Sequence, residues 1–131
     1  MKAEEGKLDE ALQIFSQIIE RYPNYGSAYN NRAQVLQFKG KVDEAITDCE
    51  KALKNSEQDV RTRRQAFTQR GILFKYKGER EKALQDFEKG AELGSELAKK
   101  EFVANNPYAM LCNQIVTEMF SKYKDLHDKN K

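Results

Sequence analysis

The sequence predicts an all-α fold, a solenoid of antiparallel helix pairs closed by C-terminal capping helices. One reason is the spacing of apolar residues, which recur at steps of three and four between charged ones, as on a helix with one buried face. The first such stripe comprises Leu8, Ala11, Leu12, Phe15, Ile18 and Ile19. The second reason is repetition. Segments 6–12 (GKLDEAL), 40–46 (GKVDEAI) and 78–84 (GEREKAL) begin 34 and 38 residues apart, and this period indicates a helical solenoid.

Composition narrows the class of protein further. The 131 residues include 23 basic and 21 acidic side chains, a net charge of +2, which favours neither a nucleic-acid partner nor a membrane. The longest apolar run is 108–112, far short of the roughly 20 residues that a membrane helix needs. No secretory signal follows Met1, and two cysteines make no disulfide framework. We therefore expect a cytoplasmic protein.

The repeat divides the chain into a partial first repeat (1–25), a second (26–59), a third (60–94), capping helices (95–127) and a tail (128–131). Only five residues precede Gly6, so we expect that most of the first repeat's leading helix lies outside this sequence. An end repeat without a neighbour leaves its apolar face uncovered. We therefore predict exposed apolar surface at the N-terminus and self-association or domain swapping through it.

Glycines mark the turns within the second and third repeats. Gly40 and Gly78 each follow a helical stripe, and a left-handed glycine there would reverse the chain. Gly78 follows Gly40 by 38 residues, whereas Gly40 follows Gly6 by 34. The four additional residues correspond to about one helical turn. We expect the next helix to begin early, near Asp59, and to carry its three arginines on that turn. A disordered loop is the alternative. The arginines are Arg61, Arg63 and Arg64.

Two further helices are predicted after the third repeat. Gly94 can end a helix and Ser95 can cap the next one, and the pair Asn106-Pro107 is typical of a final helix start. We expect this last helix to pack back on the third repeat through one apolar face. That face comprises Tyr108, Leu111, Cys112, Ile115, Met119 and Phe120.

The order of residues within each pair resembles the tetratricopeptide repeat (TPR) family over residues 1 to about 94. In both full copies an aromatic is followed by a small residue four positions on and an apolar residue three further, then by glycine. These residues are Tyr29, Ala33, Leu36 and Gly40, then Phe67, Gly71, Phe74 and Gly78. The resemblance implies a right-handed superhelix and a protein-interaction adaptor that holds a partner or peptide in a concave groove.

Residues for chemistry are sparse. The single histidine, His127, stands in a charged tail without a metal-ligand or triad pattern. Cys49 and Cys112 both lie on apolar stripes, so we expect buried, inert thiols. The glycines are isolated and form no phosphate loop. The sequence therefore indicates no enzyme, no metal and no cofactor.

The groove predicted by the solenoid is rich in asparagine and glutamine, each of which carries a donor and an acceptor. Such a lining could hold an extended peptide backbone, with arginines or lysines attracting acidic residues. A merely solvated polar face is the alternative. The candidate groove residues are Asn30, Asn31, Gln34, Gln37, Arg61, Gln65, Thr68, Gln69, Lys75 and Tyr76, with Arg32 and Arg64 as further basic groups and the apolar Phe38 and Ile72 on the same face.

The resemblance also implies a test. Many TPR co-chaperones hold the carboxylate of a heat-shock protein with two basic residues and two or three asparagines. Asn31 matches one such asparagine, but Gln65 and Gln69 occupy the basic positions of the third repeat. The clamp positions of the first repeat would lie upstream of Met1. This chain therefore retains one of the five clamp positions, Asn31. An Hsp70-class partner would then bind through a different surface than this clamp.

Two other functions compete with a groove adaptor. One is a structural or self-associating module that uses the apolar N-terminal end or the C-terminal helix. The other is RNA binding through segment 61–70 with Phe67 and Tyr76, which the near-neutral charge disfavours.

Overall fold

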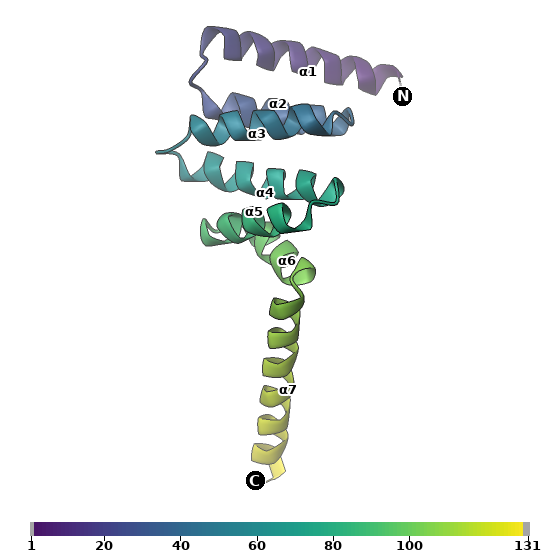
Figure 1. Ribbon diagram of the computed structural model, residues 1–131, viewed down its shortest axis with the longest axis vertical. Coiled ribbons are helices and arrows are strands. Elements are labelled where there is room, and N and C mark those ends of the chain that lie inside the picture. Colours follow the sequence, from purple (N-terminus) through teal and green to yellow (C-terminus); the bar gives the residue numbers. More distant parts are fainter. Residues whose placement is uncertain (1, 130–131) are drawn as a thin grey trace.

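The computed structural model describes residues 2–129, and this part of the chain is helical without strands, as predicted. Helices α1 to α5 are stacked one after another, each lying across the long axis of the molecule (Figure 1). Helix α6 follows at an oblique angle, and α7 extends away from the stack. The helices are α1 (Lys2–Arg21), α2 (Gly26–Phe38), α3 (Val42–Lys54), α4 (Val60–Tyr76), α5 (Arg80–Glu92), α6 (Glu96–Asn105) and α7 (Pro107–Lys129).

Small residues let the paired helices approach closely. A Cβ atom added to Gly71 in α4 would lie 2.7 Å from the Phe87 ring of α5, so the ring fills the space above that glycine. Ala33 and Ala45 are fully buried between α2 and α3. They belong to a core cluster with Cys49 and Leu73, and this cluster ties the second repeat to the third.

The turn glycines behave as the repeat predicts. Gly40, Gly78 and Gly94 have φ values of 78°, 82° and 99°, in the left-handed region that favours glycine. After each one the next backbone N–H donates to a carbonyl five residues earlier, which closes the helix end. Gly6 differs, since it lies inside α1. The helix continues through it.

The early start of α4 is confirmed. Its N-cap is Asp59, whose carboxylate accepts a hydrogen bond from the Thr62 backbone N–H at 3.1 Å. A hydrogen bond from the Thr62 hydroxyl, followed by this one from its backbone N–H, lowers the pKa of Asp59. Because of the added turn, α4 has 17 residues where α2 has 13.

The expectation that the last helix packs back on the third repeat is wrong. Among the described residues α7 contacts α6 and none of α1 to α5. The reason is α6, which packs its Ala98 and Phe102 against Ala83 and Phe87 and so already covers the end of the third repeat. The α7 residues expected to be buried are exposed instead, with Tyr108 at 81% and Phe120 at 69%.

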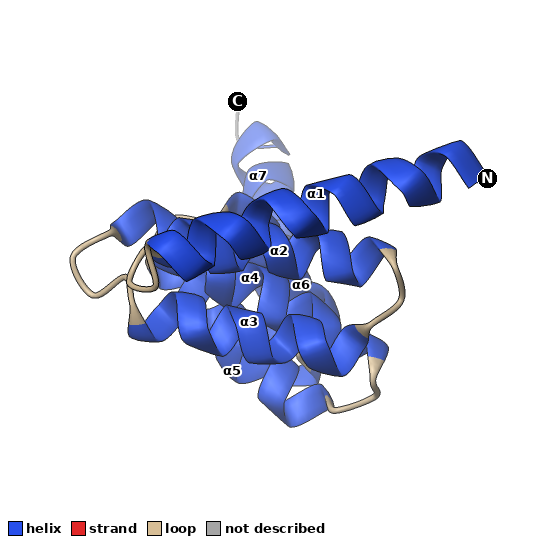
Figure 2. Ribbon diagram, turned by 90° about the horizontal axis from the view of Figure 1, so that it is seen from above, coloured by secondary structure: helices blue, strands red, loops and turns tan. Residues whose placement is uncertain are grey.

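The N-terminal helix α1 lies over α2, and its N-terminal half extends past the rest of the stack (Figure 2). Leu12 and Ile19 pack against the buried clusters of the second repeat. Leu8, Phe15 and Ile18 of the predicted stripe are half-buried, whereas Ile14, outside that stripe, is 55% exposed. Self-association through this end stays a prediction.

Candidate functional site

A hollow of about 350 Å³ lies on the face formed by α2 and α4, with one residue of α6 at its edge. Seven of the ten predicted groove residues line it, together with three apolar side chains. We call it the amide groove. It is lined by Asn30, Asn31, Gln34, Gln37, Phe38, Gln65, Thr68, Gln69, Ile72 and Leu97.

The floor of the amide groove is a network of side-chain amides that joins α2 to α4. Asn30 is 6% exposed, and its Nδ2 donates to Gln65 Oε1 at 3.3 Å. The Gln69 amide matches donors with acceptors when its nitrogen donates to Asn30 Oδ1 at 2.8 Å. In the same orientation its amide oxygen accepts from the Gln34 backbone N–H at 2.9 Å. Gln69 of α4 is therefore held against Asn30 and Gln34 of α2.

Thr68, another lining residue, connects α4 to the start of α6. It is 7% exposed, and its hydroxyl oxygen lies 2.8 Å from the Arg64 carbonyl and 2.9 Å from Ser95 Oγ. Ser95 Oγ in turn accepts from the Ala98 backbone N–H and caps α6. Thr68 thus fixes the position of α6, and with it Leu97, beside the groove.

The three remaining predicted residues lie outside this hollow. Arg61 is exposed in the first turn of α4, and Tyr76 is 80% exposed at its last residue. Lys75 lies one turn beyond Ile72, where its Nζ donates to Glu101 Oε2 of α6 at 2.8 Å. The structure therefore separates the amides from the basic residues that the sequence placed on one surface.

Arg32 and its counterpart Arg70 form paired ion contacts between the helices of each hairpin. Arg32 holds Asp48 through two hydrogen bonds of 2.7 and 2.8 Å, and Arg70 holds Asp86 with the same two distances. These hydrogen bonds raise the pKa of both arginines. Since neither arginine lines the amide groove, the expected contribution of Arg32 to an acidic ligand has no support in this geometry.

The two cysteines differ. Cys49 is fully buried, and burial raises the pKa of its thiol to about 12. Cys112 is exposed on α7, so the prediction of a buried thiol is wrong there, for the same reason that α7 does not fold back. The side chain of His127 lies outside the described residues. Among those described, no three His, Cys, Asp or Glu side chains are placed to hold a metal ion.

The only lining residue that sequence reasoning left out of the groove is Leu97. Leu97 is 50% exposed at the edge of the hollow. The signal that could have found it is the position of α6. A third first-helix in the series α2, α4, α6 continues the same face.

Comparison with known proteins agrees with this architecture. The chain is 42% identical to human tetratricopeptide repeat protein 36 over 128 residues, which cover 98% of this chain and 68% of the relative. The chain belongs to the tetratricopeptide repeat protein 36 family. The zebrafish (Danio rerio) relative is 45% identical over 94% of this chain and 66% of its own length. The chain thus spans about two thirds of the family's length.

A family model and a solved structure also match the chain as a helical repeat protein. Residues 2–104 match a model described as the TT21 fifth ARM repeats domain. The second TPR domain of human RPAP3, solved in complex with the HSP70 peptide SGPTIEEVD, is 27% identical with a TM-score of 0.67. That match covers 78% of this chain and 83% of the RPAP3 domain. The fold is that of a TPR interaction module, and none of the described helices is long and apolar enough to cross a membrane.

Proposed function

We propose that this chain is a non-enzymatic adaptor that docks an extended segment of a partner protein in the amide groove. The observation that carries the proposal is the cluster of side-chain amides from α2 and α4 around one hollow. An extended backbone presents alternating N–H and C=O groups. Each side-chain amide can accept a hydrogen bond from the N–H or donate one to the C=O. The proposal places the protein in the cytoplasm, where its two free cysteines stay reduced.

The proposed partner is a chaperone of the Hsp70 class, contacted elsewhere than at its acidic tail. Support comes from the RPAP3 TPR domain in complex with an HSP70 peptide, which shares this fold. The tail itself suits this groove poorly, because none of the residues lining the hollow is charged. Gln65 and Gln69 stand where the family's clamp has basic side chains.

The groove is tested by capturing partners on the immobilised chain and comparing two double variants by mass spectrometry. Asn31→Ala/Gln69→Ala removes amides from the groove, whereas the matched control Gln17→Ala/Gln85→Ala removes exposed amides from α1 and α5. We expect the control to retain the partners and the groove variant to lose at least about tenfold, equivalent to ~1.4 kcal/mol. Equal retention by both variants would contradict docking in the groove.

The chaperone is tested separately with purified proteins. An Hsp70-class chaperone and the same protein without its acidic tail are titrated against the chain by calorimetry. We expect the two affinities to agree within about twofold, less than 0.5 kcal/mol. Binding that disappears with the tail would show that the proposed contact is wrong.

A second candidate function is self-association through α7, supported by the apolar side chains that this helix leaves exposed. Helix α7 carries three basic and three acidic residues, so two copies would not repel strongly. Light scattering between 10 μM and 1 mM, with Met119→Glu/Phe120→Glu against Ile14→Glu, separates the two ends of the molecule. Loss of a dimer only with the α7 variant supports this function, and a monomer at all concentrations rules it out.

A further inference from the structure

The lining of the amide groove has no charged residue. Its polar members are asparagine, glutamine and one threonine, and its apolar members are Phe38, Ile72 and Leu97. Phe38 is 70% exposed and Leu97 is 50% exposed, so both are available to a ligand. Such a surface offers hydrogen bonds and apolar contact but no opposite charge for an acidic or basic segment.

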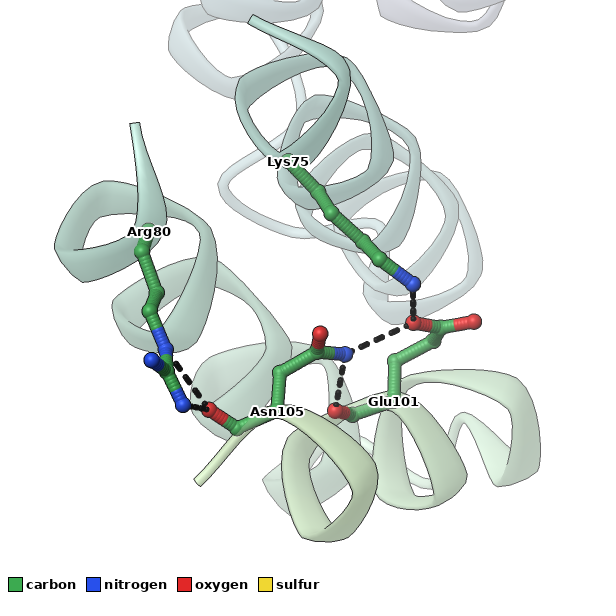
Figure 3. Close-up of polar contacts among 4 residues, drawn as sticks. All are labelled: Lys75, Arg80, Glu101 and Asn105. Carbon is green, nitrogen blue, oxygen red and sulfur yellow. Dashed lines mark hydrogen bonds and ion pairs between the residues drawn. The ribbon is translucent and has the colours of Figure 1, made fainter. Parts of the chain in front are cut away.

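A lysine next to the uncharged lining is paired with a carboxylate of α6. Lys75 follows Ile72 by one turn on α4, and Glu101 follows Leu97 by one turn on α6, so this ion pair lies just past the lining. Figure 3 shows Lys75 and Glu101 pointing toward each other across the two helices. The hydrogen bond from Lys75 lowers the pKa of Glu101, which keeps the carboxylate ionised.

A second set of contacts holds Glu101 in place. Asn105 Nδ2 donates to Glu101 Oε2 at 2.9 Å and to the Glu101 backbone carbonyl at 2.7 Å. Arg80 donates from Nε and Nη2 to the Asn105 carbonyl at 3.1 and 2.8 Å (Figure 3). Arg80 and Lys75 therefore both turn toward α6, and neither is directed to an external carboxylate.

Other arginines near the groove are also occupied by the chain itself. Arg63 Nη1 donates to the Leu53 carbonyl at 3.1 Å, and Arg64 Nη1 donates to the Leu93 carbonyl at 3.4 Å. The Leu53 carbonyl lies in the last turn of α3 and the Leu93 carbonyl at the C-cap of α5, where backbone acceptors lack partners within the helix. Arg63 thus joins the third repeat to the second, whereas Arg64 joins the two helices of the third repeat.

We propose that the amide groove selects an uncharged extended segment with amide or hydroxyl side chains and one large apolar residue, and that Glu101 sets this selectivity by neutralising Lys75. The apolar residue would lie among Phe38, Ile72 and Leu97. This inference rests on the proposed function, because it names the class of segment that the same groove takes. It differs from the acidic peptide in the RPAP3 complex.

Selection from a phage-displayed decapeptide library tests the inference. Wild-type chain, Glu101→Gln and the control Glu118→Gln, which removes one carboxylate from α7, are used as baits. Peptides are kept when Asn31→Ala/Gln69→Ala fails to bind them. We expect uncharged peptides on wild type and control, with affinities that change less than about twofold between 0.05 and 0.5 M NaCl. Glu101→Gln should bind acidic derivatives of these peptides at least about fivefold more tightly than wild type does.

The double variant Glu101→Gln/Lys75→Gln keeps the test independent of folding defects. It removes both charges, so the gain for acidic peptides should disappear while uncharged peptides still bind. Acidic peptides selected by the wild-type groove, or equal behaviour of Glu101→Gln and Glu118→Gln, would overturn the inference alone. Failure to obtain any peptide that depends on Asn31 and Gln69 would overturn the proposed groove function as well.

Discussion

Phe87 in α5 and Phe120 in α7 both lie on an apolar stripe of a helix, yet the first is fully buried and the second is 69% exposed. Helix α5 packs against α4 and α6, whereas α7 contacts α6 alone among the described helices. The same sequence signal, an apolar stripe, therefore leads to two outcomes. What decides between them is whether a neighbouring face is still uncovered when the helix is added.

The largest difference between the packed repeats and the exposed helix α7 is expected in the reactivity of their cysteines. Cys49 is buried with a pKa raised to about 12 by desolvation, whereas Cys112 is exposed on α7. With a disulfide reagent at pH 8, Cys112 should react at least about a thousandfold faster, because thiolate is the reactive form. Absorbance should report one fast thiol in the native protein and two in guanidinium chloride.

The control for this experiment is Cys112→Ser, which should remove the fast phase entirely. Two fast thiols in the native protein would mean that α3 is not packed as described. No fast thiol would mean that α7 is covered in solution.

The next largest difference is expected in how much Phe87 and Phe120 contribute to the free energy of unfolding. Phe87→Ala leaves a cavity above Gly71 and should lower the free energy of unfolding by about 3–5 kcal/mol. Phe120→Ala removes an exposed ring and should change it by less than about 0.5 kcal/mol. Urea unfolding followed by circular dichroism gives both values. A large loss for Phe120→Ala would contradict the exposed position of α7.

The ion pairs inside the hairpins should have an intermediate effect. Asp86→Asn removes the charge held by Arg70 in a contact where the aspartate side chain is 5% exposed. We expect a loss of about 2 kcal/mol, because the arginine keeps its desolvation cost without a full partner. Asp125→Asn on exposed α7 is the matched control and should change the free energy of unfolding by less than about 0.5 kcal/mol. Equal losses for the two variants in urea would argue against the hairpin ion pair.

The smallest effect is expected at the ion pair between α4 and α6. Since the pKa of Glu101 is lowered in the folded chain, its contribution to stability is present above the unfolded pKa and lost as pH falls through the folded one. Between about pH 5 and pH 3 this should cost at most about 1 kcal/mol. The slope of the free energy of unfolding against pH should be shallower in Glu101→Gln, and an unchanged slope would contradict the Lys75 contact.

Sequence reasoning succeeded where the information is local. Left-handed Gly40 and Gly78, the early start of α4 at Asp59 and the Ser95 cap each depend on residues within a few positions. Gly6, which has the same sequence context as Gly40, continues α1 instead. A glycine permits a turn without requiring one.

Sequence reasoning failed where partners are distant. The stripe on α7 indicates that one face can be buried, but not that α6 already covers the third repeat. The amides of the groove follow the repeat and were therefore predictable as a set. Lys75 was assigned to the same surface because its partner Glu101 lies 26 residues further along the chain, and no local pattern connects them.

The order of contacts has a consequence for how the protein opens. Each helix contacts its neighbours in the chain, and longer-range contacts join α2 to α4 and α4 to α6. The described helices thus form a linear series of coupled units, in which α1 and α7 each contact a single helix. Amide hydrogen exchange should be fastest in α1 and α7 and slowest around α4, which has the most neighbours. The groove would then form on the most persistent part of the chain, and local opening at either end would leave it intact.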